Sequence, residues 1–300
     1  MRILSRSSGY AGALLLAGTA ALAAPAALAS AAVQPPPNVP CSSMALAAAI
    51  QHANSVGSAT LLLAGNCNYV LTTAAAPADG LPPITGNLVI TGAQGTTISR
   101  SSSAPAFRIL HVAAGGSLTL TGVTVANGFT PSDQEGGGIK DEGTLALRNV
   151  QLTGNRALNG GGLFVGPRAH AAVSFTQFSG NAVGSLGGAV INEGSLAMDH
   201  SRLTGNTAPQ EGGGVNTQPS GTSQISSSAV FRNRAGTKGG GLSNRGTTVL
   251  FGDRVLFNTA GSAGGGIASI TGTVSLRFTL VVANSPDNCS PRGAVRGCPH

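Results

Sequence analysis

Four acidic residues lie close together near the start of the repetitive part of the chain. They are Asp133, Glu135, Asp141 and Glu142. Carboxylate oxygens in such a group could bind Ca²⁺ or act as acid and base in cleaving a glycosidic bond. A solvated acidic turn explains them more simply, because a glycosidase needs paired acids on adjacent coils and no such ladder is present. These four are the residues to mutate if the chain is catalytic, and otherwise no catalytic residue is predicted.

Other chemistry-bearing patterns are missing from the sequence. The five histidines are dispersed without metal-ligand spacing, and no glycine cluster is followed by the Gly-Lys-Ser/Thr of a phosphate-binding loop. We therefore predict no metal, cofactor or nucleotide. Glu211 and Lys238 are expected to form an exposed salt bridge between adjacent coils. Asp253 falls on an inward position, where we expect it to cap a turn, pair with Arg254 or bond an internal amide.

An asparagine recurs at nearly constant spacing through the second half of the chain. The successive steps are 26, 25, 27, 25 and 26 residues. The asparagines are Asn155, Asn181, Asn206, Asn233, Asn258 and Asn284. Because equivalent side chains align in stacked repeats, we expect them to form a structural ladder, each amide bonding the next coil.

Apolar residues precede each asparagine in a fixed pattern, for example Leu145, Leu147, Val150 and Leu152. The two-residue steps keep side chains on one face of a strand, and the three-residue step allows a bend between two strands. A glycine cluster and an aliphatic residue supply a third strand. The pattern predicts an all-β, parallel β-helix with three short strands in each coil of about 26 residues, stable only when stacked.

The chain divides into a leader and one predicted domain. Residues 1–29 are typical of a signal peptide, with Arg2 and Arg6 before an apolar run and a small-x-small cleavage site. A Pro-rich spacer spans 30–40. The single domain, 41–300, comprises an N-terminal cap with an amphipathic helix (41–83), the coils (84–284) and a C-terminal loop (285–300). No membrane span is expected after cleavage.

The four cysteines are expected to form two local disulfides. The stack of coils separates the first pair from the second by far more than a disulfide can span. The predicted bonds are Cys41–Cys67 and Cys289–Cys298. The domain without its leader is mildly basic, since 17 Lys and Arg, two of them in the leader, face 10 Asp and Glu. The basic residues are scattered and lack aromatic neighbours, so nucleic-acid binding is not predicted.

Two motifs carry a resemblance. The segments 187–190 (Gly-Gly-Ala-Val) and 178–181 (Phe-Ser-Gly-Asn) resemble the paired GGA-I and F-x-x-N motifs of chlamydial polymorphic outer-membrane proteins. The whole chain is similar to exported right-handed parallel β-helix proteins of actinobacteria, through its Ala-rich leader, residues 107–110 and residues 285–289. The resemblance implies a right-handed, pectin-lyase-like fold and an exported protein facing the surroundings of the cell.

We expect an exported, non-enzymatic scaffold, secreted or at the cell surface, of a binding or adhesion type. Its partner is not specified by the sequence, although a surface glycan or protein fits. The alternative is a polysaccharide lyase or glycoside hydrolase, and the absence of Trp makes sugar stacking less favoured. A purely structural component of the cell envelope cannot be separated from the scaffold by sequence.

Overall fold

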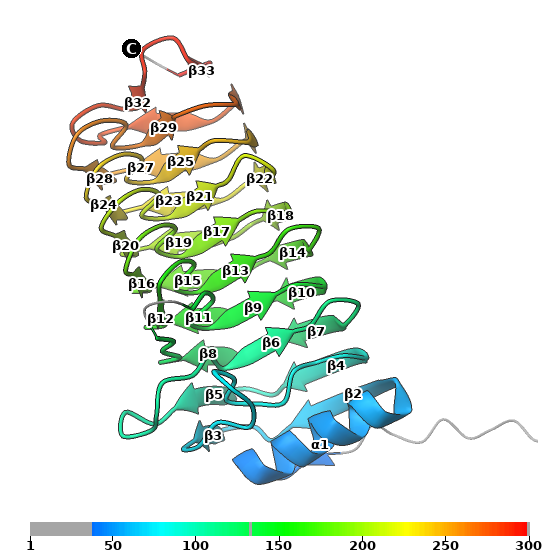
Figure 1. Ribbon diagram of the computed structural model, residues 1–300. Helices are drawn as coiled ribbons and strands as arrows, with labels where there is room; N and C mark the ends of the chain where they lie inside the picture. The colour runs from blue at the N-terminus through cyan, green and yellow to red at the C-terminus, as the bar shows by residue number, and fades with distance from the viewer. Residues whose placement is uncertain (1–37, 132–133, 299–300) are drawn as a thin grey trace, which may run out of the picture. The chain divides into compact units, whose positions relative to one another are not determined.

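The computed structural model describes residues 38–131 and 134–298. The predicted signal peptide and most of the predicted spacer lie outside the described residues. From Asn38 onward the chain winds as a right-handed parallel β-helix of about ten coils, which confirms the predicted fold class. Figure 1 shows the coils following one another from the N-terminal helix to the C-terminal loop.

The N-terminal end of the stack carries helix α1 (Ser43–Val56). Ser42 caps it, its side-chain oxygen accepting the N–H of Ala45 at 3.4 Å, and Gly57 ends it with a φ of 82°. The helix residues Leu46 and Ile50 are buried. The helix packs on the first strands of the stack (Figure 1) and so covers an edge that would otherwise be free to pair with another chain.

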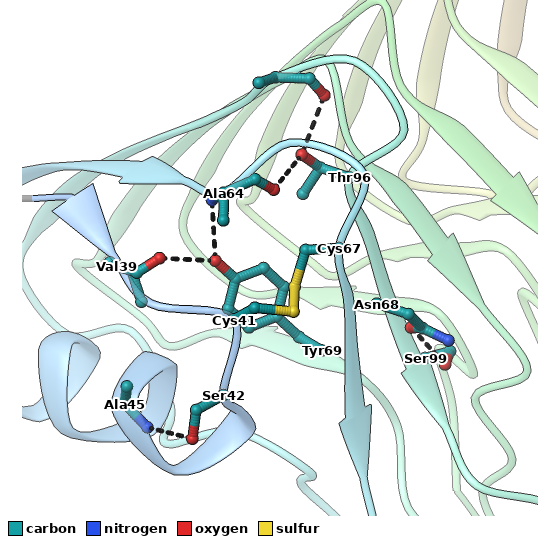
Figure 2. The surroundings of a disulfide bond; sticks show 11 residues. Val39, Cys41, Ser42, Ala45, Ala64, Cys67, Asn68, Tyr69, Thr96 and Ser99 are labelled. Atoms are coloured by element: carbon teal, nitrogen blue, oxygen red, sulfur yellow. Dashed lines mark hydrogen bonds between the residues drawn. A yellow bond between two sulfur atoms is a disulfide. The ribbon is translucent and has the colours of Figure 1, made fainter.

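Two disulfides close the two ends, as predicted. Cys41–Cys67 ties the entry of α1 to the first coil, and Cys289–Cys298 closes the C-terminal loop. Beside the first bond, the Tyr69 hydroxyl donates to the carbonyl of Val39 at 2.8 Å and accepts a hydrogen bond from a backbone N–H at 2.9 Å (Figure 2). The cap is therefore fixed by covalent and polar contacts as well as by packing.

Strands of successive coils pair in parallel and build four sheets. Sheet 1 contains β1 (Asn38–Val39), β2 (Ser58–Leu63), β4 (Asn87–Gly92), β7 (Ser117–Thr121), β10 (Thr144–Arg148), β14 (His170–Ser174), β18 (Ser195–Asp199), β22 (Thr222–Ser226), β26 (Thr247–Phe251), β30 (Thr273–Arg277) and β33 (Val295–Arg296). Sheet 2 contains β3 (Asn68–Leu71), β5 (Thr97–Arg100), β8 (Thr124–Ala126), β11 (Gln151–Thr153), β15 (Gln177–Ser179), β19 (Arg202–Thr204), β23 (Ala229–Phe231), β27 (Arg254–Leu256) and β31 (Leu280–Val282).

The remaining two sheets contain five and eight strands. Sheet 3 contains β12 (Arg156–Ala157), β16 (Ala182–Val183), β20 (Thr207–Ala208), β24 (Arg234–Ala235) and β28 (Thr259–Ala260). Sheet 4 contains β6 (Leu110–Val112), β9 (Ile139–Asp141), β13 (Leu163–Val165), β17 (Val190–Asn192), β21 (Val215–Thr217), β25 (Leu242–Asn244), β29 (Ile267–Ser269) and β32 (Cys289–Ser290). The strands of sheet 3 add to the three expected per coil. Each of them begins at the residue directly after one of the repeated asparagines.

Inward residues of successive coils lie in register. Leu145 pairs with Leu118 on one side and with Ala171 on the other, so like positions stack through the interior. The three-residue step of the pattern places one residue at the corner between sheets 1 and 2, where Asn149 and Phe175 have φ values of 52° and 49°. This left-handed conformation turns the chain while both strands keep their apolar residues inside.

Candidate functional site

The predicted acids do not converge on one point. Asp133 lies outside the described residues. Asp141 alternates with Lys140 along β9, points into the coil and is 0% exposed, whereas Glu135 and Glu142 lie half-buried at the surface. Since a side chain inside the coil cannot reach a ligand in solvent, Asp141 is unsuited to the catalytic role for which it was a candidate.

Asp141 is a buried acid with one satisfied oxygen. Its Oδ1 accepts the N–H of Gly143 at 3.0 Å, while its Oδ2 has no hydrogen-bond partner among the described residues. Burial raises the pKa of Asp141 to about 7, and the neighbouring charge of Glu142 adds to the rise. Asn192 occupies the same register position two coils on, and its Nδ2 donates to the carbonyl of Thr222 at 3.0 Å. The aspartate lacks that donor whenever it is ionised.

Glu142 belongs to an ion network that joins three coils. Its two oxygens lie 2.8 Å from Nε2 of His111 and 2.9 Å from Nζ of Lys140. On the other side of the imidazole ring, Nδ1 of His111 lies 3.0 Å from a carboxylate oxygen of Asp79. The other oxygen of Asp79 lies 2.5 Å from Nη1 of Arg108. Asp79 and Arg108 are buried, so this network fastens the N-terminal coils together. Glu142 is engaged in it, so a catalytic role would require it to give up its contact with His111 or Lys140.

The network sets the ionisation of its members. Burial by itself would raise the pKa of Asp79, but the hydrogen bond from His111 and the charge of Arg108 lower it below its usual value. Burial likewise opposes the charged form of His111, and hydrogen bonds to Asp79 and Glu142 outweigh it and raise its pKa. Both shifts favour the charged forms, which is the pattern of a structural ion network.

Glu135 differs from Glu142 in its electrostatic surroundings. Burial raises the pKa of Glu135 despite the nearby charge of Lys140. The pKa of Glu142 is lowered, because its hydrogen bonds to Lys140 and His111 outweigh the effect of burial. Two carboxyl groups with pKa values moved apart are one requirement of acid and base catalysis. This pair is the part of the predicted site that keeps a possible chemical use.

The six repeated asparagines form a continuous internal column. Oδ1 of Asn181 accepts from the backbone N–H of Asn155 at 3.0 Å and from its Nδ2 at 3.1 Å, and Nδ2 of Asn181 donates to the carbonyl of Leu152 at 2.9 Å. The same contacts recur coil after coil. The column ends at Asn288, whose Oδ1 accepts from Asn284. We call it the asparagine ladder.

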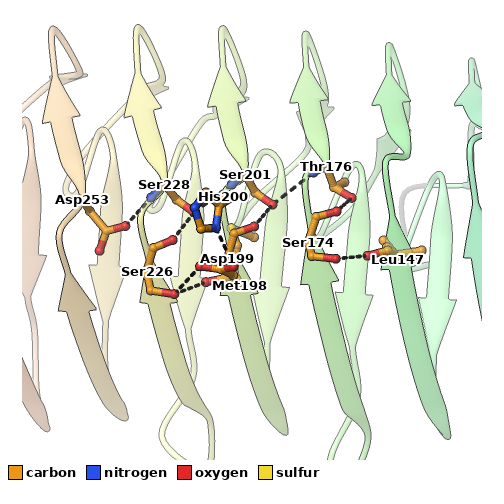
Figure 3. Close-up of polar contacts among 10 residues, drawn as sticks. All are labelled: Leu147, Ser174, Thr176, Met198, Asp199, His200, Ser201, Ser226, Ser228 and Asp253. Carbon is orange, nitrogen blue, oxygen red and sulfur yellow. Dashed lines mark hydrogen bonds and ion pairs between the residues drawn. The ribbon is translucent and has the colours of Figure 1, made fainter.

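A second column of polar residues lies at the bend between sheets 1 and 2 (Figure 3). Its members, here called the hydroxyl row, are Thr176, Ser201, Ser228, Asp253 and Thr279. From Ser201 onward, each side-chain oxygen accepts the backbone N–H of the preceding member, as in Ser201 N–H to Ser228 Oγ at 2.9 Å. Each hydroxyl in turn donates to the carbonyl two residues before it, as Ser228 does to Ser226 at 2.8 Å.

Asp253 is the exception in the hydroxyl row. Its Oδ1 accepts the N–H of Ser228 at 2.7 Å, but its Oδ2 is buried without a partner among the described residues. Burial raises the pKa of Asp253 to about 6. The expected capping of the backbone is present, whereas a pair with Arg254 is not among the ion pairs of the described residues.

Ser226, Asp199 and His200 bring a hydroxyl, a carboxylate and an imidazole together on the outer face of sheet 1 (Figure 3). Oγ of Ser226 donates to Asp199 at 2.7 Å, and the other Asp199 oxygen lies 2.6 Å from Nδ1 of His200. A catalytic serine instead donates to the imidazole that will take its proton. Because this serine bonds the carboxylate, the three residues do not activate a nucleophile. The His200 ring stacks on Phe175, with the ring centres 5.0 Å apart.

An apolar and basic surface covers the outside of sheet 2 and its corner with sheet 1 in the last coils. Phe278 is 89% exposed, Phe257 57%, and Phe251 and Leu280 49% each. The surface, here called the Phe–Arg face, comprises Phe231, Phe251, Arg254, Leu256, Phe257, Arg277, Phe278, Leu280 and Val282. Arg202 borders it, with its guanidinium 4.3 Å from the ring centre of Phe231. Neither Arg254 nor Arg277 takes part in an ion pair within the described part of the chain.

This face was not predicted, although the sequence carries a signal for it. The alternation that places Val230 and Val255 inside necessarily places Phe231 and Leu256 outside. Outward positions two coils before Phe231 are polar, since β15 offers Gln177 and Ser179 there. The change from polar to apolar along one row is the pattern that identifies the face.

No protein-family model matches the chain, and neither a curated protein nor a solved structure matches it. The resemblances drawn from the repeat motifs therefore stay predictions. Among the residues described, no group of three or more His, Cys, Asp and Glu side chains is arranged to hold a metal ion. No helix in the described part of the chain has the length and apolar character needed to cross a bilayer.

Proposed function

We propose that the protein is an exported, non-enzymatic β-helix scaffold that binds an acidic protein, outside the cell or at its surface. The Phe–Arg face is the observation that carries this proposal. Soluble proteins seldom leave large apolar side chains clustered and exposed, and such clusters mark interaction sites. The predicted leader supports export, and the two disulfides suit an oxidising compartment.

The composition of the face favours a protein over a glycan. Aromatic residues and arginine are enriched in protein interfaces, and lysine is depleted there. The face combines phenylalanines and arginines with aliphatic residues such as Leu256 and Leu280, and no lysine belongs to it. Aliphatic side chains gain little from a hydrophilic sugar chain. Arg254 and Arg277, which form no ion pair within the described residues, call for carboxylates on the partner, and a second copy of this basic chain would be repelled.

The test compares two phenylalanines at the same corner position of different coils. Phe278 belongs to the face, whereas Phe175, 63% exposed, lies outside it. Surface proteins from the source cells are passed over the immobilised chain, and the retained protein is then titrated in purified form. Phe278→Ser and Arg254→Gln should weaken its binding about tenfold each, while Phe175→Ser and Arg148→Gln should leave it unchanged. Equal loss in the control variants, or no retained acidic protein, would contradict the proposal. Retention that survives proteolysis of the surface fraction would replace the protein partner by a glycan.

A second candidate function is polysaccharide cleavage by Glu135 and Glu142. The opposite displacement of their pKa values is the observation that favours it. The chain is incubated with acidic and neutral polysaccharides, with and without Ca²⁺, and unsaturated products and reducing ends are followed. Turnover abolished by Glu135→Gln but kept in Asp141→Asn would establish this function. Without turnover at high protein concentration, the scaffold proposal stands.

A further inference from the structure

Two adjoining hollows flank Phe129, at the corner where sheets 2 and 3 meet. The first, of about 470 Å³, is lined by polar and basic residues, among them Arg100, Ser102 and Asn127. The second, of about 310 Å³, is lined by Leu158, Ala182 and Val183. Phe129 and Arg156 line both hollows. One groove therefore runs from a basic end to an apolar end.

The basic end presents two guanidinium groups. Arg100 is held in place, with Nη1 donating to the carbonyl of Ala104 at 2.7 Å and Nε to that of Asn127 at 3.1 Å. Its Nη2 donates no hydrogen bond to the described residues. The guanidinium also lies 5.6 Å from the ring centre of Phe129. Because Arg100 lines the first hollow, its Nη2 is available to a ligand there without further ordering of the side chain.

Arg156 supplies the second guanidinium from the other side of Phe129. Its backbone is fixed, because its N–H donates to the carbonyl of Gly128 at 2.8 Å and its carbonyl accepts from Thr130 at 3.0 Å. The side chain is exposed and takes part in no ion pair within the described residues. None of the residues that line the two hollows is acidic. Charge complementarity at this end therefore favours an anion.

The apolar end determines what the anion must carry. Phe129 is 43% exposed at the junction, and Leu158 and Val183 are only partly covered beside it. These side chains gain from contact with a hydrocarbon group, by about 25 cal/mol for each Å² removed from water. A free inorganic anion would leave this end wetted, and an uncharged hydrocarbon would leave the guanidiniums unpaired.

We infer that this groove binds an amphiphilic anion with one aliphatic chain. Its carboxylate or phosphate head lies between Arg100 and Arg156, and its chain lies over Phe129 against Leu158 and Val183. This site is separate from the Phe–Arg face, and it does not depend on the function proposed for that face.

Binding of dodecanoate, below the concentration at which it forms micelles, tests the inference by isothermal titration calorimetry. Dodecanol keeps the chain without the charge, inorganic phosphate keeps an anion without the chain, and vesicles of phosphatidylglycerol present the same chemistry in a bilayer. Dodecanoate should bind at least about tenfold more tightly than dodecanol or phosphate, since a charge-assisted pair contributes that much. Binding to vesicles alone would assign the groove to a lipid surface and overturn the single-ligand inference.

Arg234 gives a matched control, because it occupies in β24 the outward position that Arg156 occupies in β12. Arg156→Gln should weaken dodecanoate binding about tenfold, and Arg234→Gln should not change it. Leu158→Asp tests the apolar end and should weaken binding to a similar extent, while thermal unfolding checks that each variant folds. An equal effect of Arg156→Gln and Arg234→Gln, or equal affinity for dodecanoate and dodecanol, would contradict the inference.

Discussion

The asparagine ladder and the hydroxyl row are two internal columns that meet the same demand. Each supplies partners for backbone groups that turn inward at a corner of the coils through which it runs. An asparagine amide offers two donors and one acceptor oxygen, so every ladder member, from Asn155 to Asn284, both receives and donates. A hydroxyl offers one donor and one acceptor oxygen, which suffices for Thr176, Ser201 and Ser228.

The two columns differ in how they tolerate substitution. The ladder keeps asparagine at all six positions, whereas the hydroxyl row accepts threonine, serine and once aspartate. Ionised Asp253 has no donor, and its Oδ2 is left without a partner in the described structure. Within the hydroxyl row, a member can therefore change its residue type without loss only while it keeps an acceptor and a donor, and an acid meets this condition only when protonated.

Asn206→Ala should have the largest effect. It removes the acceptor for the backbone N–H and Nδ2 of Asn181, and the donor for the carbonyl of Phe178 and for Asn233. Stranding these buried groups should lower the free energy of unfolding by about 4 to 6 kcal/mol, at about 1 to 3 for each group. Urea denaturation measures it. Gly205→Ala is no suitable control, because Gly205 has a φ of 63°, so Thr207→Ala, exposed in β20, serves instead. A loss below about 1 kcal/mol would mean that the ladder is not needed for stability.

Asp141→Asn should stabilise the protein above neutral pH. The folded-state pKa of Asp141, about 7, lies above the ordinary 3.8, so the folded chain binds more protons between these values. The stability that protonated Asp141 contributes is therefore fully present below about pH 4. It is lost as pH rises towards 7, which lowers the free energy of unfolding by up to about 4 kcal/mol. Asparagine carries no charge and supplies the donor that Asn192 uses. Denaturation at pH 4 and pH 8 should show a gain only at pH 8, and an equal gain at both would contradict the argument.

Asp253→Ser should also stabilise the protein at high pH, by somewhat less than Asp141→Asn. The pKa of Asp253 is raised from 3.8 to about 6, so the native aspartate loses up to about 3 kcal/mol of stability as pH rises from 4 to 6. Serine restores both the acceptor and the donor of the row. The unfolding midpoint of the variant should rise at pH 8 and stay near the original at pH 4. Asp199→Asn is the contrasting variant, since hydrogen bonds from His200 and Ser226 lower the pKa of Asp199, and it should bring no gain at high pH.

Much of this architecture follows from periodicity alone. The 2, 3, 2 spacing of residues such as Leu145, Leu147, Val150 and Leu152 fixes which side chains face inward, and these are buried. The stack height separates the cysteine pairs and so selects Cys41–Cys67 and Cys289–Cys298. Such features depend on local alternation and on the repeat, which a sequence displays directly.

The candidate site was less predictable because it depends on which side chains meet across coils. Glu211 was expected to pair with Lys238, its neighbour in the stack, but it pairs with Arg245 and accepts from Ser243. Four acids close in sequence suggested one cluster, yet the alternation along β9 sends Asp141 inward and leaves Glu142 to His111 and Lys140. The partner of a long charged side chain depends on its length and its rotamer, and the spacing of residues along the sequence specifies neither.

Ser228→Ala tests the hydroxyl row with the smallest expected effect. It removes the acceptor for the N–H of Ser201 and the donor for the carbonyl of Ser226, while the backbone N–H of Ser228 still donates to Asp253. One buried N–H left without its partner should lower the free energy of unfolding by about 2 kcal/mol. Ser227→Ala is the matched control, because Ser227 is exposed at the same corner, one residue before Ser228, and it should change stability little. If the two variants lost equal stability, the row would contribute no more than an ordinary surface serine. A loss as large as that of Asn206→Ala would instead make the two columns equivalent and remove the distinction drawn between them.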